Sequence, residues 1–458
     1  MPADADVLLE GPPILLVNPW ITDLAAYDLW ARPLGLLYLA AVLRDHGYRV
    51  RLVDCLRGNG RGDGPAARRT EDGRGKLNKI QLPRPAPYAR IPRRYGRYGI
   101  SPAAFLKSLA LGPDPAAILV TTGMTYWYPG VIDTIALLRD RYPGVPVLLG
   151  GVYATLCPEH ARHHSGADRV LPGPGESKVL QAVDEICGRP GSRRLYDDPD
   201  EIPFPAFDLY DRADAACLLT SRGCPLRCTY CAAHLLTPAF RQRSVEGVLA
   251  ELEWLSRGLR IRHIAFYDDA LLVAADEHIK PILEGVIARD LDVRFHTPNG
   301  LHAGLLDRQT AELMFRAGFR TIRLSLETVD ETLQRRIGPK VTRDDLARAL
   351  DHLTQAGFRR QEIGVYLLAG LPGQEIEGII ASVDFVSSLG AAARLALYSP
   401  IPGTAEWRRA VREGPAQMEN EPLWHNNTAY SLTIPALREG GLEKIKEHVR
   451  LRNRSLVH

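Results

Sequence analysis

One loop constrains the fold and chemistry of this chain more than any other stretch. Residues 221–231 carry three of the seven cysteines, Cys224, Cys228 and Cys231, spaced C-x3-C-x2-C and accompanied by a glycine and a proline. Thiolates this close together on a turn-forming segment can converge on one soft metal centre. Three sulfur ligands can hold three irons of a 4Fe-4S cluster and leave the fourth iron open to a small chelating ligand.

Two other interpretations of the same cysteines stay open. One is a zinc site in which His234 is the fourth ligand. The other is a group of buried structural cysteines. Zinc sites usually pair their ligands as two separated couples, so the spacing favours the cluster. The remaining cysteines are dispersed and are expected to be buried small hydrophobes: Cys55, Cys157, Cys187 and Cys217.

The loop resembles the signature of the radical S-adenosylmethionine (SAM) superfamily, including an aromatic residue, Tyr230, directly before the third cysteine. Residues 213–403 as a whole are similar to the core domain of that superfamily. The resemblance implies that the open iron chelates the amino and carboxylate groups of SAM. It also implies that an electron from the cluster, supplied by a donor such as flavodoxin or ferredoxin, cleaves SAM to methionine and a 5′-deoxyadenosyl radical.

The N-terminal part of the chain alternates short apolar runs with helical patterns. This alternation predicts an α/β fold with an open parallel sheet in residues 1–190, flavodoxin-like or Rossmann-like. The expected strands are residues 13–18, 48–54, 116–121, 145–150 and 168–171. The expected helices are residues 34–46, 129–142, 158–164 and 176–187. Such sheets bind ligands beyond the carboxyl ends of their strands.

The loops at those strand ends are rich in glycine and small polar residues, which let the backbone approach a large ligand. Together with residues 33–40, they resemble the cobalamin-binding domain that precedes the core in one class of radical SAM enzymes. The resemblance implies cobalamin contacts from these loops. The candidate residues are Pro19, Trp20, Thr122, Met124, Thr125, Tyr126, Gly150, Gly151, Thr155, Gly173, Gly175 and Glu176.

The chain departs from other cobalamin enzymes at one motif. The D-x-H-x-x-G pattern that gives cobalt a histidine is missing, because Asp45-His46-Gly47 does not fit it. The resemblance implies cobalt without a protein histidine below it. The side chains of Met124, Thr125 and Tyr126 would then face the lower side of the cobalt. The alternative is that they are ordinary loop and core residues.

Residues 56–107 form an insertion between the second and third predicted strands. Within residues 57–97 there are 12 Lys and Arg against 3 acidic residues, along with many Gly and Pro. The arginine-rich and tyrosine-rich run of residues 91–100 could bind a phosphate or a carboxylate. The alternative is a solvated, partly disordered excursion. Residues 191–212, rich in Asp and Pro, are expected to be a linker.

A second alternation of strands and helices occupies residues 213–403 and predicts a partial (β/α)6 barrel with its site at the carboxyl ends of the strands. The expected strands are residues 216–221, 263–267, 293–296, 321–326, 362–368 and 393–397. The expected helices are residues 245–256, 276–289, 307–317, 343–356 and 374–388. The cysteine loop follows the first of these strands.

Further candidate SAM contacts follow other barrel strands. Asp268 and Asp269 match the superfamily segment that holds the amino group of SAM, and alternation along a strand allows at most one of them to point inward. Asp269 could instead cap a helix. The resemblance implies a contact to the SAM ribose or amino group from Ser325 or Glu327, and places the turn at Gly370 against adenine.

Residues 404–458 are expected to be a small extension with a final helix at residues 442–452. If the extension folds over the barrel, it would cover the substrate side. Its only reactive-looking cluster is residues 424–427. His425 in this cluster is expected to be a surface histidine, and the alternative is that it accepts a proton in the reaction.

Composition narrows the setting of the protein. A net charge of +3 is too small to indicate nucleic-acid binding. No apolar run approaches the roughly 18 residues that a membrane span needs. The acidic, polar N-terminus is unlike a signal peptide, and clustered cysteines suit a reducing compartment. A cytoplasmic protein is therefore expected.

The combined resemblance implies a cobalamin-dependent radical SAM enzyme, most simply a methyltransferase that moves a methyl group through methylcobalamin to an unactivated carbon. The alternative with the same cofactors is a cyclisation, a rearrangement or an oxidation. A methylthiotransferase for tRNA would need a second cluster from N-terminal cysteines, which are too dispersed. A cobalamin or redox sensor would need an output module that the sequence does not contain. The substrate stays open.

Overall fold

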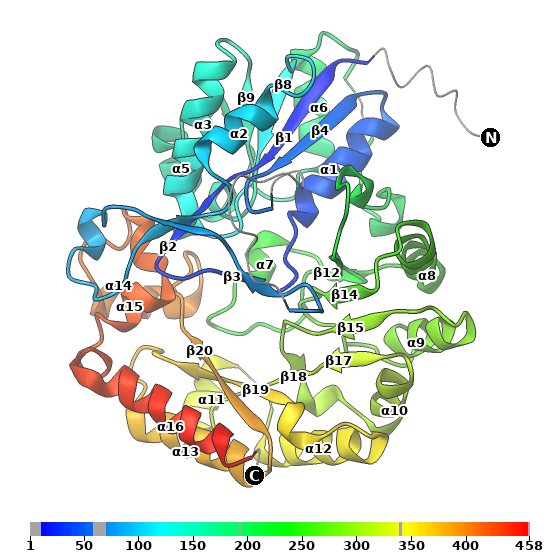
Figure 1. The fold of residues 1–458 in the computed structure, drawn as a ribbon. Coiled ribbons are helices and arrows are strands. Elements are labelled where there is room, and N and C mark those ends of the chain that lie inside the picture. Colours follow the sequence, from blue (N-terminus) through cyan, green and yellow to red (C-terminus); the bar gives the residue numbers. More distant parts are fainter. Residues whose placement is uncertain (1–10, 58–69, 192–193, 339–340, 457–458) are drawn as a thin grey trace. The chain divides into compact units, whose positions relative to one another are not determined.

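The computed structural model describes residues 11–57, 70–191, 194–338 and 341–456. The chain divides into two compact units, here called the N-terminal unit (residues 1–214) and the C-terminal unit (residues 215–458). Each unit has its own sheets and its own core (Figure 1). They are described in turn.

The N-terminal unit is built on a parallel five-stranded sheet in the order β10-β9-β8-β1-β4. In chain order this is 2-1-3-4-5, the flavodoxin-like arrangement, so the predicted fold class is confirmed. The central strand, β8, is apolar and buried on both faces, as parallel strands are. The strands are β1 (Pro13–Asn18), β4 (Arg49–Asp54), β8 (Ala117–Val120), β9 (Val147–Leu149) and β10 (Arg169–Val170).

Helices cover both faces of this sheet. The face that carries Leu15 and Val17 packs against Phe105, Val131 and Ile135 from α2 and α3. Helices α1 and α6 contact each other and cover the opposite face (Figure 1). The helices are α1 (Leu34–Asp45), α2 (Pro102–Leu109), α3 (Tyr128–Arg141), α4 (Val152–Leu156), α5 (Pro158–His164) and α6 (Glu176–Ile186).

The described part of the insertion is folded against the segment that follows β1. Strand β7 (Gly96–Tyr98) pairs antiparallel with β2 (Ile21–Asp23) and with β6 (Lys79–Gln81). Strand β5 (Gly75–Lys76) pairs with β3 (Tyr27–Asp28). The described insertion is therefore not a solvated excursion. Residues 58–69 lie outside the described ranges.

The arginine and tyrosine run within the insertion makes internal contacts. Arg97 forms an ion pair with Asp133 at 2.7 Å and lies 4.9 Å above the ring of Trp20. The rings of Tyr88 and Tyr95 are buried against each other. These side chains stabilise the unit, and the expectation that the run binds a phosphate or a carboxylate finds no support in them.

Residues 191–212, expected to be a linker, belong to the N-terminal unit as far as they are described. The backbone N–H of Ala206 donates to the carbonyl of Leu37 at 3.1 Å, and Phe207 is buried. The Tyr210 hydroxyl donates to Asp54 at 2.7 Å. The boundary between the units lies at 214/215 because these contacts hold the segment to the first sheet.

The C-terminal unit is a partial barrel of parallel strands, as predicted. The fourth predicted strand is broken at Ile322 into β17 and β18, which divides the wall into the sheets β11-β14-β15-β17 and β16-β18-β19-β20. The strands are β11 (Ala215–Leu218), β14 (His263–Phe266), β15 (Arg294–His296), β16 (Leu301–His302), β17 (Phe319–Thr321), β18 (Arg323–Glu327), β19 (Gly364–Ala369) and β20 (Ala392–Leu397).

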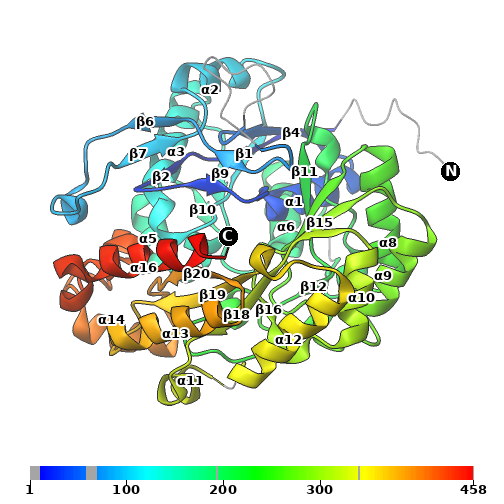
Figure 2. The same cartoon turned by 60° about the horizontal axis from the view of Figure 1, so that its bottom comes forward.

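Helices lie along the outer side of this wall (Figure 2). They follow the strands because apolar residues at helical spacing face the sheet, as in α12, where Leu346, Leu350 and Leu353 are fully buried. The helices are α8 (Val245–Glu253), α9 (Ile279–Ala288), α10 (Arg308–Arg316), α11 (Glu331–Ile337), α12 (Arg343–Ala356) and α13 (Ile376–Ser388).

The C-terminal extension closes one edge of the barrel wall. Helix α16 (Leu442–Arg454) packs against α13 and β20, and the Asn453 side chain bonds both the N–H and the C=O of Ala393 at 2.9 Å. An edge strand is thereby covered. His425 is 2% exposed and packs against Trp407, so it is a core residue and not the expected surface histidine.

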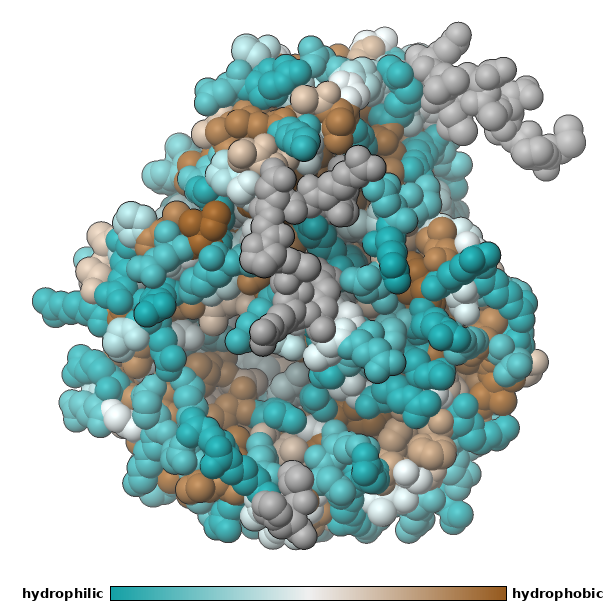
Figure 3. Space-filling model, in the orientation of Figure 1, coloured by the Kyte–Doolittle hydropathy of each residue, from teal (hydrophilic) through white to brown (hydrophobic). Residues whose placement is uncertain are grey.

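No helix in the described ranges is long and apolar enough to cross a membrane. On the face of the molecule in Figure 3, hydrophobic side chains are scattered among hydrophilic ones.

Candidate cluster and cofactor sites

The cysteine loop begins at a tight turn directly after the first barrel strand. The short strand β12 (Ser221–Arg222) pairs antiparallel with β13 (Arg241–Gln242) and turns at Gly223. Gly223 has a φ of 75°, and a Cβ atom there would lie 2.6 Å from the Ala239 carbonyl oxygen. Only glycine fits this turn, which brings the three cysteines to the carboxyl end of β11.

The three cysteines lie together in an otherwise apolar patch. Cys224 and Cys228 are buried, Cys231 is partly buried, and none of the three is in a disulfide. Cys224 and Cys231 pack with Ala233 and Ala270. Burial raises the pKa of Cys231, and the nearby Cys228 and Cys224 thiols raise it further. Three thiols are thus held close together, as a cluster site requires.

The arrangement fits a cluster better than a single ion. In the described ranges no three His, Cys, Asp or Glu side chains are arranged to hold one metal ion, so the Cys3His zinc site finds no support. The sulfurs of a 4Fe-4S cluster each bind a different iron and need not converge on one point. The donor set therefore fits the cluster.

Neighbouring elements fix the loop between the second and third cysteines. The N–H of Thr229 donates to the Ile337 carbonyl, and the Thr229 carbonyl accepts from the N–H of Glu406, both at 3.0 Å. The Tyr230 hydroxyl donates to Oε1 of Glu327 at 3.0 Å. Burial and the Glu327 carboxylate raise the pKa of Tyr230, which keeps the phenol protonated. Helices α11 and α14 (Ala405–Glu413) and strand β18 thus all hold this turn.

The two candidate aspartates after β14 have different roles. Asp268 is 4% exposed and accepts hydrogen bonds from the backbone N–H and the hydroxyl of both Thr220 and Ser221, at 2.6 to 3.2 Å. Its carboxylate is fully engaged in fixing the start of the cysteine loop. Asp268 is therefore a structural residue of the site.

Asp269 is the aspartate that is accessible. Its side chain is exposed, yet desolvation, and then the neighbouring Asp268 carboxylate, raise its pKa to about 6. The carboxylate is therefore accessible to a ligand although its surroundings disfavour the charged form. Its charge also reaches the Cys231 thiol, whose pKa it raises. It caps none of the described helices, so the capping alternative finds no support.

The remaining predicted SAM contacts lie at the ends of β18 and β19. Glu327 is 6% exposed and has a φ of 70°, a strained conformation for a residue with a side chain. The Ser325 Oγ lies against Gly300, where a Cβ atom would approach it to 2.1 Å. Gly370 has a φ of 90°, and its N–H donates to the Gln374 side chain at 2.9 Å. These residues lie at or near the carboxyl ends of their barrel strands, and the cysteine loop likewise follows the carboxyl end of β11.

The N-terminal unit contains a cavity of about 340 Å³ at the carboxyl ends of β1 and β8. These two strands flank the topological switch point, because the chain leaves β1 toward β4 and returns on the other side at β8. Residues at the ends of both strands line it, including Asn18, Pro19, Trp20, Thr121 and Thr122, together with Gly151 from the loop after β9. Four of the predicted residues, Pro19, Trp20, Thr122 and Gly151, are thus brought together.

The other predicted cofactor residues of this unit are not among the residues described as lining the cavity. Met124 is 41% exposed, whereas Thr125 and Tyr126 are buried, and burial raises the pKa of Tyr126. Gly150 precedes Gly151 at the end of β9. The Thr155 hydroxyl accepts from the N–H of Gly173 at 2.9 Å, joining the loops after β9 and β10. Gly175 and Glu176 begin α6.

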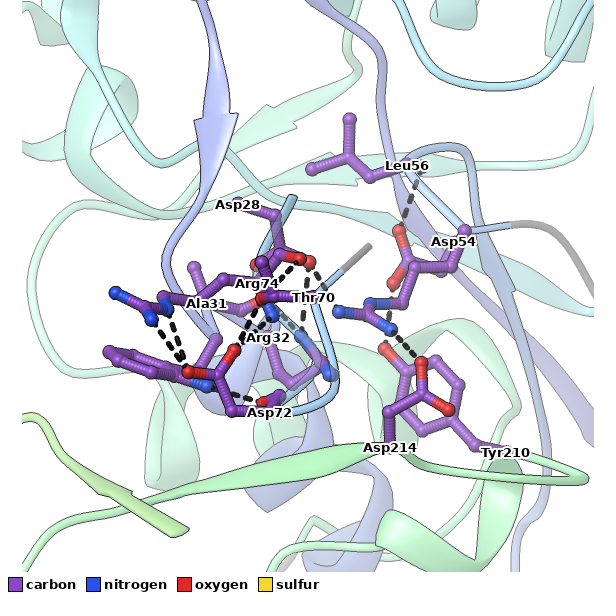
Figure 4. Close-up of polar contacts among 12 residues, drawn as sticks. Asp28, Ala31, Arg32, Asp54, Leu56, Thr70, Asp72, Arg74, Tyr210 and Asp214 are labelled. Atoms are coloured by element: carbon purple, nitrogen blue, oxygen red, sulfur yellow. Dashed lines mark hydrogen bonds and ion pairs between the residues drawn. The ribbon is translucent and has the colours of Figure 1, made fainter. Parts of the chain in front are cut away.

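Sequence reasoning missed the charged residues of the cavity wall. Asp28, Arg32 and Arg57 line it with little exposed side-chain surface, and Asp28 forms ion pairs with both arginines (Figure 4). The one available signal was an Asp and an Arg at i and i+4, between Trp20 and the start of α1. Because isolated charges of this kind are common on surfaces, this signal is weak.

Comparison with known proteins identifies the C-terminal unit. Residues 218–386 match the model of the radical SAM superfamily. The chain carries a radical SAM domain. Enzymes of this superfamily use a 4Fe-4S cluster and SAM, and the loop of Cys224, Cys228 and Cys231 stays the predicted site of the cluster.

The chain is similar to proteins named methyltransferases. It is 23% identical to the cytidylyl-2-hydroxyethylphosphonate methyltransferase of Streptomyces wedmorensis, over 95% of this chain and 88% of that protein. It is 26% identical to an uncharacterised methyltransferase of Pyrococcus horikoshii, over 65% of this chain and 70% of that protein.

Solved structures share the fold of the whole chain. The radical SAM methyltransferase TsrM of Kitasatospora setae, solved with cobalamin and a 4Fe-4S cluster, superposes with a TM-score of 0.64 at 18% identity, over 91% of this chain and 81% of that one. The cobalamin-dependent radical SAM enzyme OxsB superposes with a TM-score of 0.59 at 18% identity, over 96% of this chain and 61% of that one.

Proposed function

We propose that this enzyme binds cobalamin in the N-terminal unit and methylates an unactivated carbon. The observation that carries the proposal is the cavity at the switch point of a flavodoxin-like sheet, in the same chain as a radical SAM cysteine loop. When bound, the cluster supplies the electron for SAM cleavage, and cobalamin carries the methyl group. The names of the relatives and the cobalamin bound to TsrM agree with this choice.

The cavity has the features that a large flat cofactor requires. Gly35, in the first turn of α1, lines it, and a Cβ atom there would meet no atom within 4 Å. At Gly151 a Cβ atom would come within 2.5 Å of the Thr122 carbonyl, so the two strand ends approach as closely as only glycine allows. The volume of about 340 Å³ lies at the lower end of the roughly 300–1,000 Å³ of sites for drug-sized ligands, so the cavity would hold one part of the cofactor.

A lower histidine ligand is not part of the proposal. His46 lies at the carboxyl end of α1, where its Nδ1 lies 2.9 Å from the Val42 carbonyl. Gly35, which lines the cavity, is at the other end of the same helix, and eleven residues of helix span roughly 16 Å. Met124, Thr125 and Tyr126, predicted to face the lower side of the cobalt, lie next to lining residues of the cavity in the chain but do not line it among the residues described.

Residues at the barrel strand ends would hold SAM. Asp269 would accept a hydrogen bond from the SAM ammonium group, because it is the accessible member of the aspartate pair. Glu327 and Ser325 would contact the ribose or the amino group, and the Gly370 turn would lie against adenine. Tyr230 acts by holding the Glu327 carboxylate in place.

The same proposal implies an electron donor, a cellular compartment and a class of substrate. A small electron donor such as flavodoxin or ferredoxin would reduce the cluster. The enzyme would work in the cytoplasm and bind no nucleic acid, and its net charge of +3 agrees with this. The substrate would be a molecule that contains an unactivated carbon, and the names of the relatives give no common substrate.

The proposal is tested by the products of SAM. The full chain is reconstituted anaerobically with iron, sulfide and cobalamin, reduced, and given SAM without a substrate. Methyl transfer predicts S-adenosylhomocysteine in amounts that follow the bound cobalt, and no S-adenosylhomocysteine from a preparation that lacks cobalamin. The formation of 5′-deoxyadenosine alone, independent of cobalamin, would contradict methyl transfer and favour the cyclisation, rearrangement or oxidation.

A further inference from the structure

Arg32 is a buried arginine with unused hydrogen-bond donors at the cavity of the N-terminal unit. Its side chain is 1% exposed and lines the cavity. Nη1 donates to the Ala31 carbonyl at 2.9 Å and lies 3.6 Å from Oδ2 of Asp28. Among the described residues, Nε and Nη2 have no hydrogen-bond partner (Figure 4).

Two unused donors on a buried cation are costly. A buried donor without a partner destabilises the folded protein, and a charged donor does so more strongly. Asp28 offsets only part of this cost, because the same oxygen also pairs closely with Arg57. An oxygen acceptor on a ligand in the cavity would satisfy both donors at once, since Nε and Nη2 form one edge of the planar guanidinium.

The surrounding structure keeps Arg32 in this position. Pro33 follows it and begins α1, whose first turn lines the same cavity. Trp30 precedes it with a φ of 68°, and the Trp30 Nε1 donates to the Asp72 carbonyl at 2.7 Å. Arg74 stacks on the Trp30 ring at 5.0 Å. The insertion, through residues 72–74, therefore fixes the backbone that carries Arg32.

We propose that Arg32 anchors the ligand of this cavity by donating from Nε and Nη2 to an oxygen acceptor on that ligand. The inference rests on the proposed function, under which the ligand is cobalamin. The periphery of cobalamin offers two kinds of acceptor: the amide carbonyls of the corrin side chains and the phosphate of the nucleotide loop. Lysine would not replace Arg32, because an ammonium group cannot present two parallel N–H donors.

The test measures corrinoid binding without any turnover. The full chain, with its cluster reconstituted, is titrated with hydroxocobalamin and with cobinamide, which lacks the nucleotide loop. The variants are Arg32→Met and Arg32→Lys, and the latter keeps the charge beside Asp28. The control is Arg44→Met, at the carboxyl end of α1, which removes an arginine that pairs with Asp208 at 2.6 Å and does not line the cavity. Melting temperature and cluster iron verify that each variant is folded.

The proposal predicts that both Arg32 variants bind hydroxocobalamin roughly tenfold more weakly or worse, while Arg44→Met binds as the wild type does. A loss confined to hydroxocobalamin assigns the acceptor to the phosphate. An equal loss for cobinamide assigns it to the amide carbonyls. Unchanged affinity of a folded Arg32→Lys or Arg32→Met for both corrinoids would overturn the proposal. A wild type that binds neither corrinoid would overturn the proposed function itself, and the anchor with it.

Discussion

The cysteine loop and the cavity are two ways of building a cofactor site. The loop draws its metal ligands from eight consecutive positions, and neighbouring elements only hold it in place. The wall of the cavity is formed by residues at the ends of β1, β4, β8 and β9 and at the start of α1. A covalently bound cluster needs a few donors at fixed spacing, whereas a non-covalent ligand is held by many small contacts.

This difference predicts different responses to substitution. Loss of one thiolate removes an entire metal–ligand bond, so the loop should respond in an all-or-none way. Loss of one contact in the cavity removes a fraction of the binding free energy, so the cavity should respond by degrees. The predictions below begin at the cysteine loop and its surroundings and end in the N-terminal unit, from the largest expected effect to the smallest.

Cys228→Ala should abolish the cluster. Removal of a buried ligand leaves only two thiolates, and the iron content of anaerobically purified protein should fall from about four per chain to near zero. SAM cleavage should be lost as well. Cys187→Ser is the control, because Cys187 lies on the other unit at the end of α6. Full iron in the Cys228 variant would contradict the assignment of the loop.

Asp268→Asn and Asp269→Asn should show which aspartate stabilises the cysteine loop and which one binds SAM. The Asp268 variant loses charge-assisted acceptors for Thr220 and Ser221, so its melting temperature and its iron content should both fall. The Asp269 variant should keep its stability and its iron but bind SAM roughly tenfold more weakly, as measured by titration. The opposite pattern would mean that Asp268 holds SAM.

Tyr230→Phe should have a moderate effect. The variant keeps the ring and removes the hydroxyl that donates to Glu327, so the buried carboxylate loses one donor. The expected loss is about 1–2 kcal/mol of stability, visible as a lower melting temperature of the C-terminal unit with iron retained. Tyr267→Phe, at a partly buried tyrosine beside Asp268, provides a comparison. An unchanged melting temperature would show that the hydroxyl does not support the loop.

The smallest expected effect concerns pH and the N-terminal unit. Burial, and then the nearby His164, lower the pKa of His160 to about 4, against about 6.5 when unfolded. The unfolded chain therefore binds a proton first, so stability is full above about pH 6.5 and falls as the pH drops toward 4. His160→Gln keeps a partner for Tyr153 and should flatten this dependence of melting temperature on pH. A wild-type profile in that variant would contradict the assignment.

The contrast also explains what the sequence could predict. The strands of both sheets follow from apolar runs between turn residues, and their order follows from the right-handed crossover rule. The cluster site follows from the spacing of three cysteines in one turn. Both depend on residues close together in the chain, where pattern and structure are linked directly.

The rest depends on residues far apart. The role of Asp268 comes from its four donors on Thr220 and Ser221, 47 and 48 positions away, which spacing along a strand cannot reveal. Arg32 shows no sign in the sequence that it is buried, because Trp30 and the insertion enclose its backbone only in the folded state. The polar composition of the insertion is typical of a solvated segment, although antiparallel pairing with β2 and β3 orders its described part.

The measurement that tests the central claim most directly is a count of iron and cobalt on one anaerobic preparation, purified with cobalamin supplied. The account predicts about four irons and one cobalt per chain. Iron without cobalt would contradict the cobalamin site and leave a radical SAM enzyme with a front unit of another function. Zinc in place of both metals would contradict the cluster assignment as well.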